Sequence, residues 1–430
     1  MSDLKLTPYW WESAPLENAL SVEVPASADV CIVGAGFAGL SAALHLARAG
    51  RSVVVFDSQR AGEGASTRNG GIASGNIKFA FDDMIEKFGL DRAKDIYAEG
   101  IAARDHLSAM IKAEKIECSF QMTGRFTGAN YAVDYEKQAR EVDVLNKHLD
   151  MGAEMVLKAN QHTELGTDLY EGGQIRPDIA GLHPGQLHKG MLDRAAGAGA
   201  SVISETRVRK INKTESGFDI ITARGSLVAR EVIVATNGYT DGLIPWLERR
   251  IIPIPSQIIV TENIEPKLMD QLMPKRRMLG NTLNLYNYFR PSPDGKSIIF
   301  GGRKGADTED LVKKTEGLQA QLVELFPELK DIGISHSWWG YTGYTFDYLP
   351  KVTVHDGIHY AVGFCGSGVV WATWLGLKSA LAILGEQDAE TIFAKYPFQT
   401  RPLYYGKPWF LPFVIGLYDV KDKLNRLRYG

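Results

Sequence analysis

The pattern of hydrophobic and polar positions predicts a chain that mixes helices and strands. An apolar run over 29–33 leads into a glycine-rich turn and a helix that ends near Ala49, and a second apolar run covers 52–56. Two short, fully apolar runs joined through a helix are typical of parallel strands in a βαβ unit. Apolar residues at helical spacing predict further helices over 82–115, 135–149, 187–198 and 369–384.

Alternating or continuous apolar segments predict strands in the remaining parts of the chain. The segments 218–222 and 227–229 alternate as a hairpin would, and 231–236 is apolar enough for a buried strand. Proline and glycine turns separate several other segments, which is typical of an antiparallel sheet. Strands are also predicted at 201–204, 208–211, 251–261, 283–290, 297–302 and 359–363.

These elements predict an α/β composite fold of two interleaved domains. A Rossmann-like, dinucleotide-binding domain is expected to be discontinuous, and an antiparallel β-sheet substrate domain with helices is inserted into it. The first domain is assigned to 28–80, 187–245 and 355–385, the second to 81–186 and 246–354, and a C-terminal packing segment to 386–430.

The turn after the first strand carries the strongest chemical signal in the chain. Gly34 permits a tight turn, Gly36 lets the backbone approach a pyrophosphate, and Gly39 lets helix and strand pack closely. Asp57 ends the second strand, where a carboxylate accepts hydrogen bonds from ribose hydroxyls. The nucleotide contacts predicted on this unit are Gly34, Ala35, Gly36, Phe37, Ala38, Gly39, Asp57 and Ser58.

Composition narrows the function classes. A formal charge of −3 without a basic stripe argues against nucleic acid as a partner. Three cysteines without a C-x-x-C pair indicate neither a disulfide framework nor a zinc site, so no metal is expected, and a reducing, cytoplasmic location is favoured. No signal peptide and no membrane-spanning segment is evident.

The apolar stretch 408–418 is expected to pack against the body, with a peripheral membrane contact or a subunit interface as alternatives.

Several ordered motifs together resemble the D-amino-acid-oxidase-like family of FAD-dependent amine and amino-acid oxidoreductases, and within it the branch that acts on gamma-glutamylputrescine. They are the glycine turn, GASTRNGG at 64–71, ATNGY at 235–239, YFR at 288–290 with GGR at 301–303, and GFCGSGV at 363–369. The resemblance implies that FAD also contacts Ala65, Ser66, Thr67, Arg68, Asn69, Gly70, Gly71, Val208, Thr236, Asn237, Gly238, Gly363, Phe364, Gly366, Ser367, Gly368 and Val369.

Two departures from the family pattern bear on the cofactor. Ser367 stands where members of the family often have histidine, which leaves the backbone contacts intact but removes an imidazole. The region 338–343, where some relatives attach flavin through cysteine, has no cysteine, and 61–71 has no histidine. FAD is therefore expected to bind non-covalently.

The implied reaction is hydride transfer from a C–H beside an amine nitrogen to flavin N5, followed by hydrolysis of the imine. The lysine that clamps the substrate carboxylate in some relatives is missing from 369–371, which favours a gamma-glutamylputrescine-like amine over N-methyl or cyclic amino acids and D-amino acids. Arg290, Tyr341 and Trp371 are the predicted substrate-positioning residues, with Arg125 and Arg303 as further candidates and Trp338, Trp339 and Tyr344 as possible pocket aromatics.

The electron acceptor and the rival functions stay open at this point. By a rough matching of strands, Ile299 stands where some relatives have the lysine that activates oxygen. The electron acceptor could therefore be O2, or it could be a quinone or protein carrier. The competing interpretations are a FAD-binding protein without turnover and an NAD-dependent dehydrogenase that uses only the first βαβ unit. The oligomeric state is not indicated by the sequence.

Overall fold

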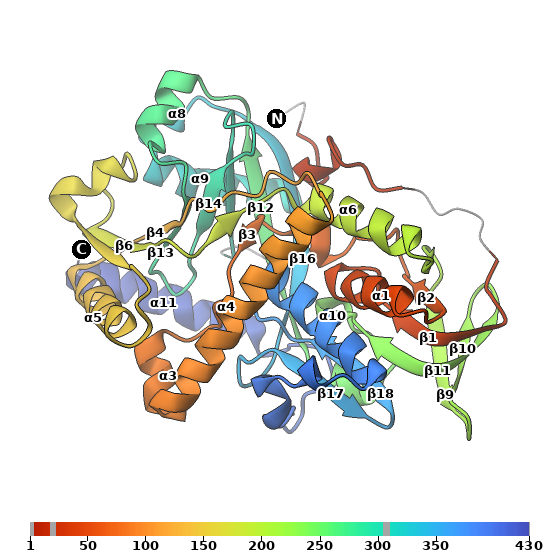
Figure 1. Ribbon diagram of the computed structural model, residues 1–430. Coiled ribbons are helices and arrows are strands. Elements are labelled where there is room, and N and C mark those ends of the chain that lie inside the picture. Colours follow the sequence, from red (N-terminus) through yellow and green to blue (C-terminus); the bar gives the residue numbers. More distant parts are fainter. Residues whose placement is uncertain (1–3, 18–22, 304–309, 430) are drawn as a thin grey trace.

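A computed structural model describes residues 4–17, 23–303 and 310–429 of the 430-residue chain. These residues form two eight-stranded sheets and one two-stranded sheet, with helices against both large sheets (Figure 1). The strands of each large sheet come from several separate stretches of the sequence, so the chain passes repeatedly between the two sheets.

The first sheet has the strand order β17-β18-β11-β1-β2-β8, and β9 and β10 extend from β11. The pairs β1–β2, β1–β11, β2–β8 and β11–β18 are all parallel. Carboxyl ends of parallel strands share one edge of a sheet, and this edge is where ligands bind in such folds. The strands are β1 (Ser27–Val33), β2 (Val53–Phe56), β8 (Ser201–Ile203), β9 (Val208–Lys213), β10 (Phe218–Thr222), β11 (Ser226–Val234), β17 (Lys351–His355) and β18 (Ile358–Val362).

Three helices cover this sheet: α1 (Phe37–Arg48), α6 (Pro184–Gly197) and α10 (Gly368–Leu384). α1 and α10 cross closely, because a Cβ added at Gly376 would lie 2.2 Å from the carbonyl oxygen of Ala38. Both helices contribute to the core cluster under the sheet, with Leu40 and Leu375 fully buried. Two segments more than three hundred residues apart in the sequence are thereby packed side by side.

The second large sheet has the order β16-β12-β15-β14-β13-β4-β6-β5 and is antiparallel except for the pair β13–β4. Its strands are β4 (Arg125–Gly128), β5 (Glu154–Leu157), β6 (Gly172–Arg176), β12 (Ile252–Thr261), β13 (Met278–Asn281), β14 (Tyr288–Pro291), β15 (Ile298–Gly302) and β16 (Ile334–Tyr344). The small sheet joins β3 (Ile72–Ala73) to β7 (Ala180–Gly181).

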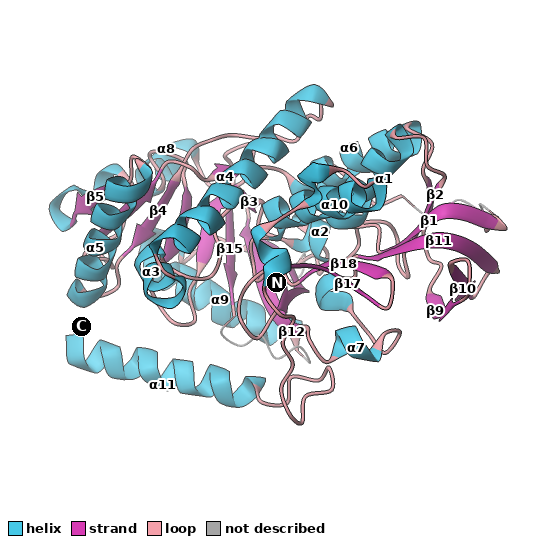
Figure 2. Cartoon of the chain, turned by 60° about the horizontal axis from the view of Figure 1, so that its bottom comes forward, coloured by secondary structure: helices cyan, strands magenta, loops and turns pink. Residues whose placement is uncertain are grey.

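The remaining helices surround the second sheet or connect the two sheets (Figure 2). The α-helices are α2 (Ala65–Arg68), α3 (Phe81–Phe88), α4 (Leu90–Ala113), α5 (Ala132–Leu149), α7 (Pro245–Glu248), α8 (Pro266–Leu272), α9 (Leu311–Leu325) and α11 (Leu411–Tyr429). The 3-10 helices are η1 (Tyr9–Trp11), η2 (Lys158–Thr163), η3 (Asn237–Tyr239), η4 (Pro327–Leu329), η5 (Gln387–Ala389) and η6 (Ile392–Lys395).

Three expectations need correction. The single helix over 82–115 is two helices, because Gly89 adopts a φ of +82° and separates α3 from α4. The strand over 283–290 is shorter, and 283–287 is a loop that leads into β14. The stretch 408–418 packs against the body only in part. Phe410 lies against the buried Tyr404, but α11 begins at Leu411 and has no buried residue, and Figure 2 shows this helix along the outside of the molecule.

The domain boundaries themselves stay a prediction. Residues 304–309, which belong to the predicted range 246–354, and Gly430, which ends the predicted segment 386–430, lie outside the described residues. Within the described ranges, no helix is both long enough and apolar enough to cross a bilayer.

Candidate active site

The glycine turn between β1 and α1 is built as the sequence predicts. Gly34 has a φ of +109°, which a residue with a side chain rarely adopts. A Cβ at Gly39 would lie 1.9 Å from the Gly34 carbonyl oxygen, and a Cβ at Gly36 would lie 2.7 Å from the Ser66 Oγ. The turn therefore depends on glycine at each of the three positions, and the amino end of α1 opens towards the sheet edge.

Asp57 stands beside this turn because β1 and β2 are parallel neighbours. Its Oδ2 accepts a hydrogen bond of 2.8 Å from the Ala35 amide, and its Oδ1 accepts one of 2.9 Å from the Gln59 amide. Burial raises the pKa of the carboxyl group to about 6, although these amides favour the ionised form. The carboxylate is thus fixed at the turn, in the place where a ribose would lie.

The segment 64–71 forms a second wall around α2. Ser66 Oγ accepts a hydrogen bond of 2.9 Å from the Phe37 amide, which ties this segment to the start of α1. Asn69 closes the turn after α2, since its Oδ1 accepts from the Gly71 amide at 2.8 Å. Arg68 donates through Nε to the Glu63 carbonyl at 2.7 Å, and burial lowers the pKa of its guanidinium.

The segment 363–368 between β18 and α10 forms the third wall. Cys365 and Gly366 have φ values of +51° and +105°, and this tight loop ends where α10 begins at Gly368. Asn237 supports it from the end of β11, because its Oδ1 accepts a hydrogen bond of 2.8 Å from the Gly363 amide. The loop presents backbone amides and a helix amino end, which together favour a partly negative group.

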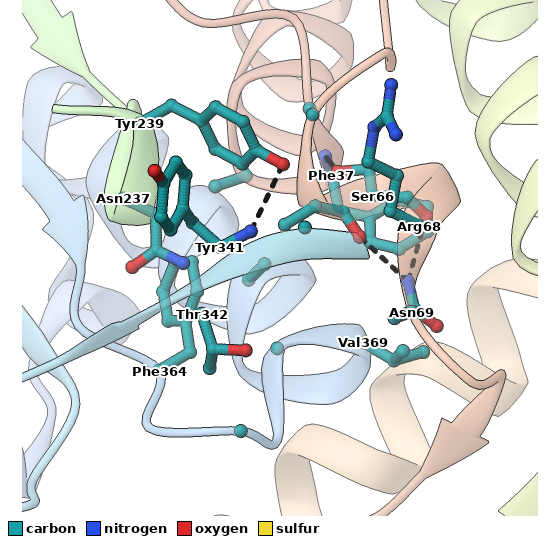
Figure 3. Close-up of a pocket in the computed structure, with 18 of the residues that line it drawn as sticks. Phe37, Ser66, Arg68, Asn69, Asn237, Tyr239, Tyr341, Thr342, Phe364 and Val369 are labelled. Atoms are coloured by element: carbon teal, nitrogen blue, oxygen red, sulfur yellow. Dashed lines mark hydrogen bonds between the residues drawn. The ribbon is translucent and has the colours of Figure 1, made fainter. Parts of the chain in front are cut away.

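These walls enclose a cavity of about 510 Å³. Figure 3 shows Tyr239 and Tyr341 on one side of it and Ser66, Arg68 and Asn69 on the other. The Tyr341 amide donates to the Tyr239 hydroxyl at 3.3 Å. The predicted residues that line the cavity are Gly34, Gly36, Phe37, Ala38, Asp57, Ser58, Ala65, Ser66, Arg68, Asn69, Gly70, Val208, Thr236, Asn237, Tyr341, Phe364, Gly366, Ser367, Gly368 and Val369.

Six other predicted cofactor residues lie outside the cavity lining and support those that line it. They act through turns and packing: Thr67, for instance, donates through Oγ1 to the Gly62 carbonyl at 2.8 Å. The six are Ala35, Gly39, Thr67, Gly71, Gly238 and Gly363.

A group of positive charges, which we call the basic end, closes the cavity: Lys78 from the loop between β3 and α3, and Arg125 and Arg303 from the ends of strands in the second sheet. Arg303 lies just after β15, and Arg125 begins β4. Among the described residues none of the three forms an ion pair with an acidic side chain, and the Nε atoms of both arginines are buried without a hydrogen-bond partner. Arg125 and Arg303 are half-buried and Lys78 is exposed, so these charges are only partly removed from water. Three positive charges gathered at a cavity without counter-ions still favour an anionic ligand.

Tyr286 lies among these charges. The Lys78 Nζ is 4.4 Å from the centre of its ring, and the Arg303 guanidinium carbon is 5.2 Å from the same point. The positive charge of Arg303, with smaller effects of Lys78 and Arg125, lowers the pKa of the Tyr286 hydroxyl to about 7 against the opposing effect of burial. Arg303 also donates through Nη2 to the Tyr344 hydroxyl at 2.6 Å.

Two of the three predicted substrate-positioning residues do not line the cavity. Arg290 is buried, and it donates to the carbonyls of Gly71 at 2.7 Å and Leu182 at 2.8 Å. Trp371 is fully buried in α10 and donates through Nε1 to the Asn76 carbonyl at 3.2 Å. Both side chains are therefore used within the protein, and of the three only Tyr341 faces the cavity.

The expected aromatic lining also differs. Trp338, Trp339 and Tyr344 are absent from the cavity wall, and Trp338 is fully buried with its Nε1 bonded to the Arg68 carbonyl. The tyrosines that line the cavity are Tyr239, Tyr286, Tyr288 and Tyr341. Lys78 and Tyr286 were missed because each lies in a loop without a motif, where only a contact between distant segments gives the residue its place.

Comparison with known protein families decides the assignment. Residues 29–380 match the family profile described as FAD dependent oxidoreductase (DAO). The chain belongs to this family. The prediction of the family, of the α/β composite fold and of FAD as the cofactor is thereby confirmed. As a member of the family, the protein is a FAD-dependent oxidoreductase that acts on an amine or amino-acid substrate.

Individual relatives of this FAD-dependent oxidoreductase support the same family assignment. The chain is 30% identical over 411 residues to gamma-glutamylputrescine oxidoreductase of Escherichia coli (strain K12), a match that covers 92% of this chain and 93% of the relative. Among solved structures, glycine oxidase from Geobacillus kaustophilus superposes with a TM-score of 0.74 at 20% identity, over 88% of this chain and 99% of the other. L-proline dehydrogenase from P. horikoshii gives a TM-score of 0.69 at 17% identity, over 91% and 99%.

The residues of this FAD-dependent oxidoreductase fit the cofactor of its family. Glycines 34, 36 and 39 leave room that any Cβ would fill, and the start of α1 offers free backbone amides to a pyrophosphate. Asp57 suits a ribose, and the amino end of α10 suits the electron-rich edge of a flavin ring. When bound, FAD supplies the acceptor for the hydride and the electrons.

Proposed function

We propose that this chain oxidises a C–N bond of an amine that also carries a carboxylate, with a gamma-glutamylated diamine as the favoured substrate. The observation that carries the proposal is the basic end, where Lys78, Arg125 and Arg303 face the cavity and none of them pairs with a carboxylate of the described residues. The two acidic side chains that also line the cavity, Asp57 and Asp241, form no ion pair with them. A substrate carboxylate would supply the missing charge through charge-assisted hydrogen bonds. The similarity to gamma-glutamylputrescine oxidoreductase supports the same substrate class.

The residues of the chain position the substrate rather than activate it. Arg125 and Arg303 hold the carboxylate, and the tyrosines at 239, 286, 288 and 341 line the space that an extended aliphatic chain would cross. The primary amine loses a hydride from the carbon beside nitrogen and a proton from nitrogen, and water converts the resulting imine to an aldehyde and ammonia. Enclosure by the three walls orients the reacting carbon and excludes bulk water.

We further propose that FAD is held non-covalently, through the cavity-lining residues of the three walls and Val208. The electrons then pass either to O2 or to a quinone or protein carrier. α-Amino acids such as sarcosine, proline, pipecolate or D-amino acids also carry a carboxylate and are the alternative substrates. Their carboxylate lies within a few bonds of the reacting carbon, whereas that of a gamma-glutamyl amide lies many bonds away.

The test is anaerobic reduction of the bound flavin, followed as bleaching of its visible absorbance. Gamma-glutamylputrescine is compared with putrescine, which is the same diamine without the gamma-glutamyl group and its carboxylate, and with the α-amino acids named above. We expect rapid bleaching by gamma-glutamylputrescine and much slower bleaching by putrescine. Equal rates for the two would contradict a role for the carboxylate, and no bleaching by any compound would favour a FAD-binding protein without turnover. Recolouring in air separates an oxidase from a dehydrogenase.

Two variants locate the carboxylate. Arg125→Met and Arg303→Met are each expected to raise the half-saturating concentration of gamma-glutamylputrescine by about 10- to 100-fold, because each removes a hydrogen bond to a charged group. Saturation by putrescine should be unchanged in both. Arg230→Met is the matched control, since that side chain is 73% exposed and pairs with Asp29 away from the cavity. A loss shared equally by both substrates would argue against the proposed contact.

A further inference from the structure

Helix α11 displays a row of large apolar side chains to solvent. Phe413, Leu417, Val420, Leu424 and Leu427 are between 52% and 85% exposed, although each is large and apolar. Their spacing alternates between four and three residues, so they form one continuous line along the helix. Leu403, Tyr405 and Trp409, which precede the helix, are also at least 59% exposed. We call these eight residues the C-terminal strip.

The opposite side of α11 is the one that contacts the body. Asp422 accepts hydrogen bonds from the amides of Asn284 at 3.0 Å and Leu285 at 3.2 Å, and from the Asn284 side chain at 2.6 Å. Arg426 pairs with Glu324 of α9 at 3.2 Å. The helix is therefore held to the body by polar contacts on one face, and the strip on the other face is exposed. Figure 2 shows the helix itself at the outside of the molecule.

The charges around the strip are of one sign. Between residues 401 and 429 the exposed charged side chains are all basic, although the chain as a whole has a formal charge of −3. The two acidic residues of this segment are only partly exposed: Asp422 is bonded to the body, and Asp419 pairs with Lys423 at 2.7 Å. The exposed basic residues are Arg401, Lys407, Lys421, Lys423, Arg426 and Arg428.

We propose that the C-terminal strip docks this protein on the surface of an anionic lipid bilayer, with α11 lying in the plane of the interface. An apolar face with Phe, Trp and Leu, flanked by Lys and Arg, is the pattern of helices that bind such surfaces. Each basic side chain near an anionic surface adds to the attraction. The proposal is independent of the substrate proposed above.

Charge also argues against a second copy as the occupant. A symmetric pair of α11 helices would be self-complementary, so each basic flank would face the same basic flank of its partner. Lys421 and Arg428 border the strip on one side and Lys423 on the other, and like charges at these positions destabilise helix pairs. An anionic surface is attracted by the same residues.

The experiment is co-sedimentation of the FAD-loaded protein with vesicles of phosphatidylcholine alone or mixed with phosphatidylglycerol. We expect binding to the mixed vesicles, which falls as salt is raised, and little binding to phosphatidylcholine. Leu417→Ser/Leu424→Ser and Lys421→Gln/Arg428→Gln should each weaken binding by about tenfold or more. Leu157→Ser/Val354→Ser is the matched control, because these two side chains are 59% and 55% exposed elsewhere and should leave binding unchanged.

Light scattering of the same proteins in solution tests the alternative, in which the strip binds a second copy of the chain. A stable dimer that the Leu417→Ser/Leu424→Ser variant dissociates would overturn the proposal and assign the strip to a second copy. Failure to sediment with the mixed vesicles would overturn it directly, and so would equal binding to both kinds of vesicle. Flavin content and the unfolding temperature, measured in each variant, show that the fold is intact.

Discussion

Tyr286 is the residue whose chemistry depends most on its surroundings. Its hydroxyl is acidic because Arg303, Lys78 and Arg125 surround it, and together they lower its pKa to about 7. When no anion is bound, the negative charge of an ionised Tyr286 partly balances the positive charge of the basic end. A substrate carboxylate would perform the same task, so the two negative charges compete.

This competition predicts a pH dependence. The carboxylated substrate should bind best when Tyr286 is protonated, so its half-saturating concentration should rise about tenfold between about pH 6 and about pH 8, as the hydroxyl ionises through its pKa. Tyr286→Phe should flatten this rise. Burial raises the pKa of Tyr288 to about 12, so Tyr288→Phe is a control that should retain it. Steady-state saturation curves across this range test the prediction, and an unchanged slope in Tyr286→Phe would refute it.

The arginines show what sequence can and cannot predict at this scale. The sequence offers Arg125, Arg290 and Arg303 as candidates and favours Arg290 as a substrate-positioning residue. The structure separates them by their partners: Arg290 donates to three backbone carbonyls, whereas Arg125 and Arg303 face the cavity. Which hydrogen-bond acceptors a side chain meets depends on contacts between distant segments, and no local pattern contains that information.

At the scale of elements, the glycine turn was the most predictable feature of the molecule. At Gly34 and Gly39 the backbone itself leaves no place for a side chain, so the requirement is local and visible in the sequence, whereas a Cβ at Gly36 would meet the Ser66 side chain. The loop 283–287 is the contrasting case. It was predicted as a strand from its apolar residues, but hydrogen bonds from Asn284 and Leu285 to Asp422 hold it in a different conformation.

Gly39→Ala tests the turn. The new methyl group would meet the Gly34 carbonyl oxygen, so α1 must shift away from the turn, and we expect at least about a tenfold loss of FAD affinity and a lower unfolding temperature. Gly197→Ala is the control, because a Cβ at that position of α6 meets no atom within 4 Å. Flavin released on ultrafiltration measures the effect. Full retention of FAD by Gly39→Ala would show that the close approach is unnecessary.

At the scale of the whole molecule, the two large sheets and α11 meet around one cavity. The first sheet supplies the nucleotide-binding turn, and the second supplies the two arginines of the basic end. α11 holds the loop 283–287, whose members Leu283 and Tyr286 line the cavity. The interleaving of the two sheets was predictable from the order of strand and helix patterns. The contact between α11 and the loop 283–287 was not predictable, because it depends on hydrogen bonds from Asn284 and Leu285 to the distant residue Asp422.

Asp422→Ala tests this connection. Removing the carboxylate frees the amides of Asn284 and Leu285, so the loop beside Tyr286 loses its anchor, and we expect the half-saturating concentration of substrate to rise by about threefold to tenfold. FAD content should not change, since the nucleotide wall is formed by other elements. Asp331→Ala, at a position where the side chain is 86% exposed, is the control. An unaltered saturation curve would show that the loop holds its place without α11.

The pairing of α1 with α10 has a consequence for how the protein is made. The glycine turn leaves the ribosome early, but the loop 363–368 and α10, which complete the wall opposite it, are synthesised more than three hundred residues later. Domains generally fold as units, so a domain whose parts are far apart in the sequence completes its fold only after the last part has been made. The nascent chain therefore cannot enclose its cofactor until most of it has been translated, and until then the apolar face of α1 that α10 covers is exposed to chaperones.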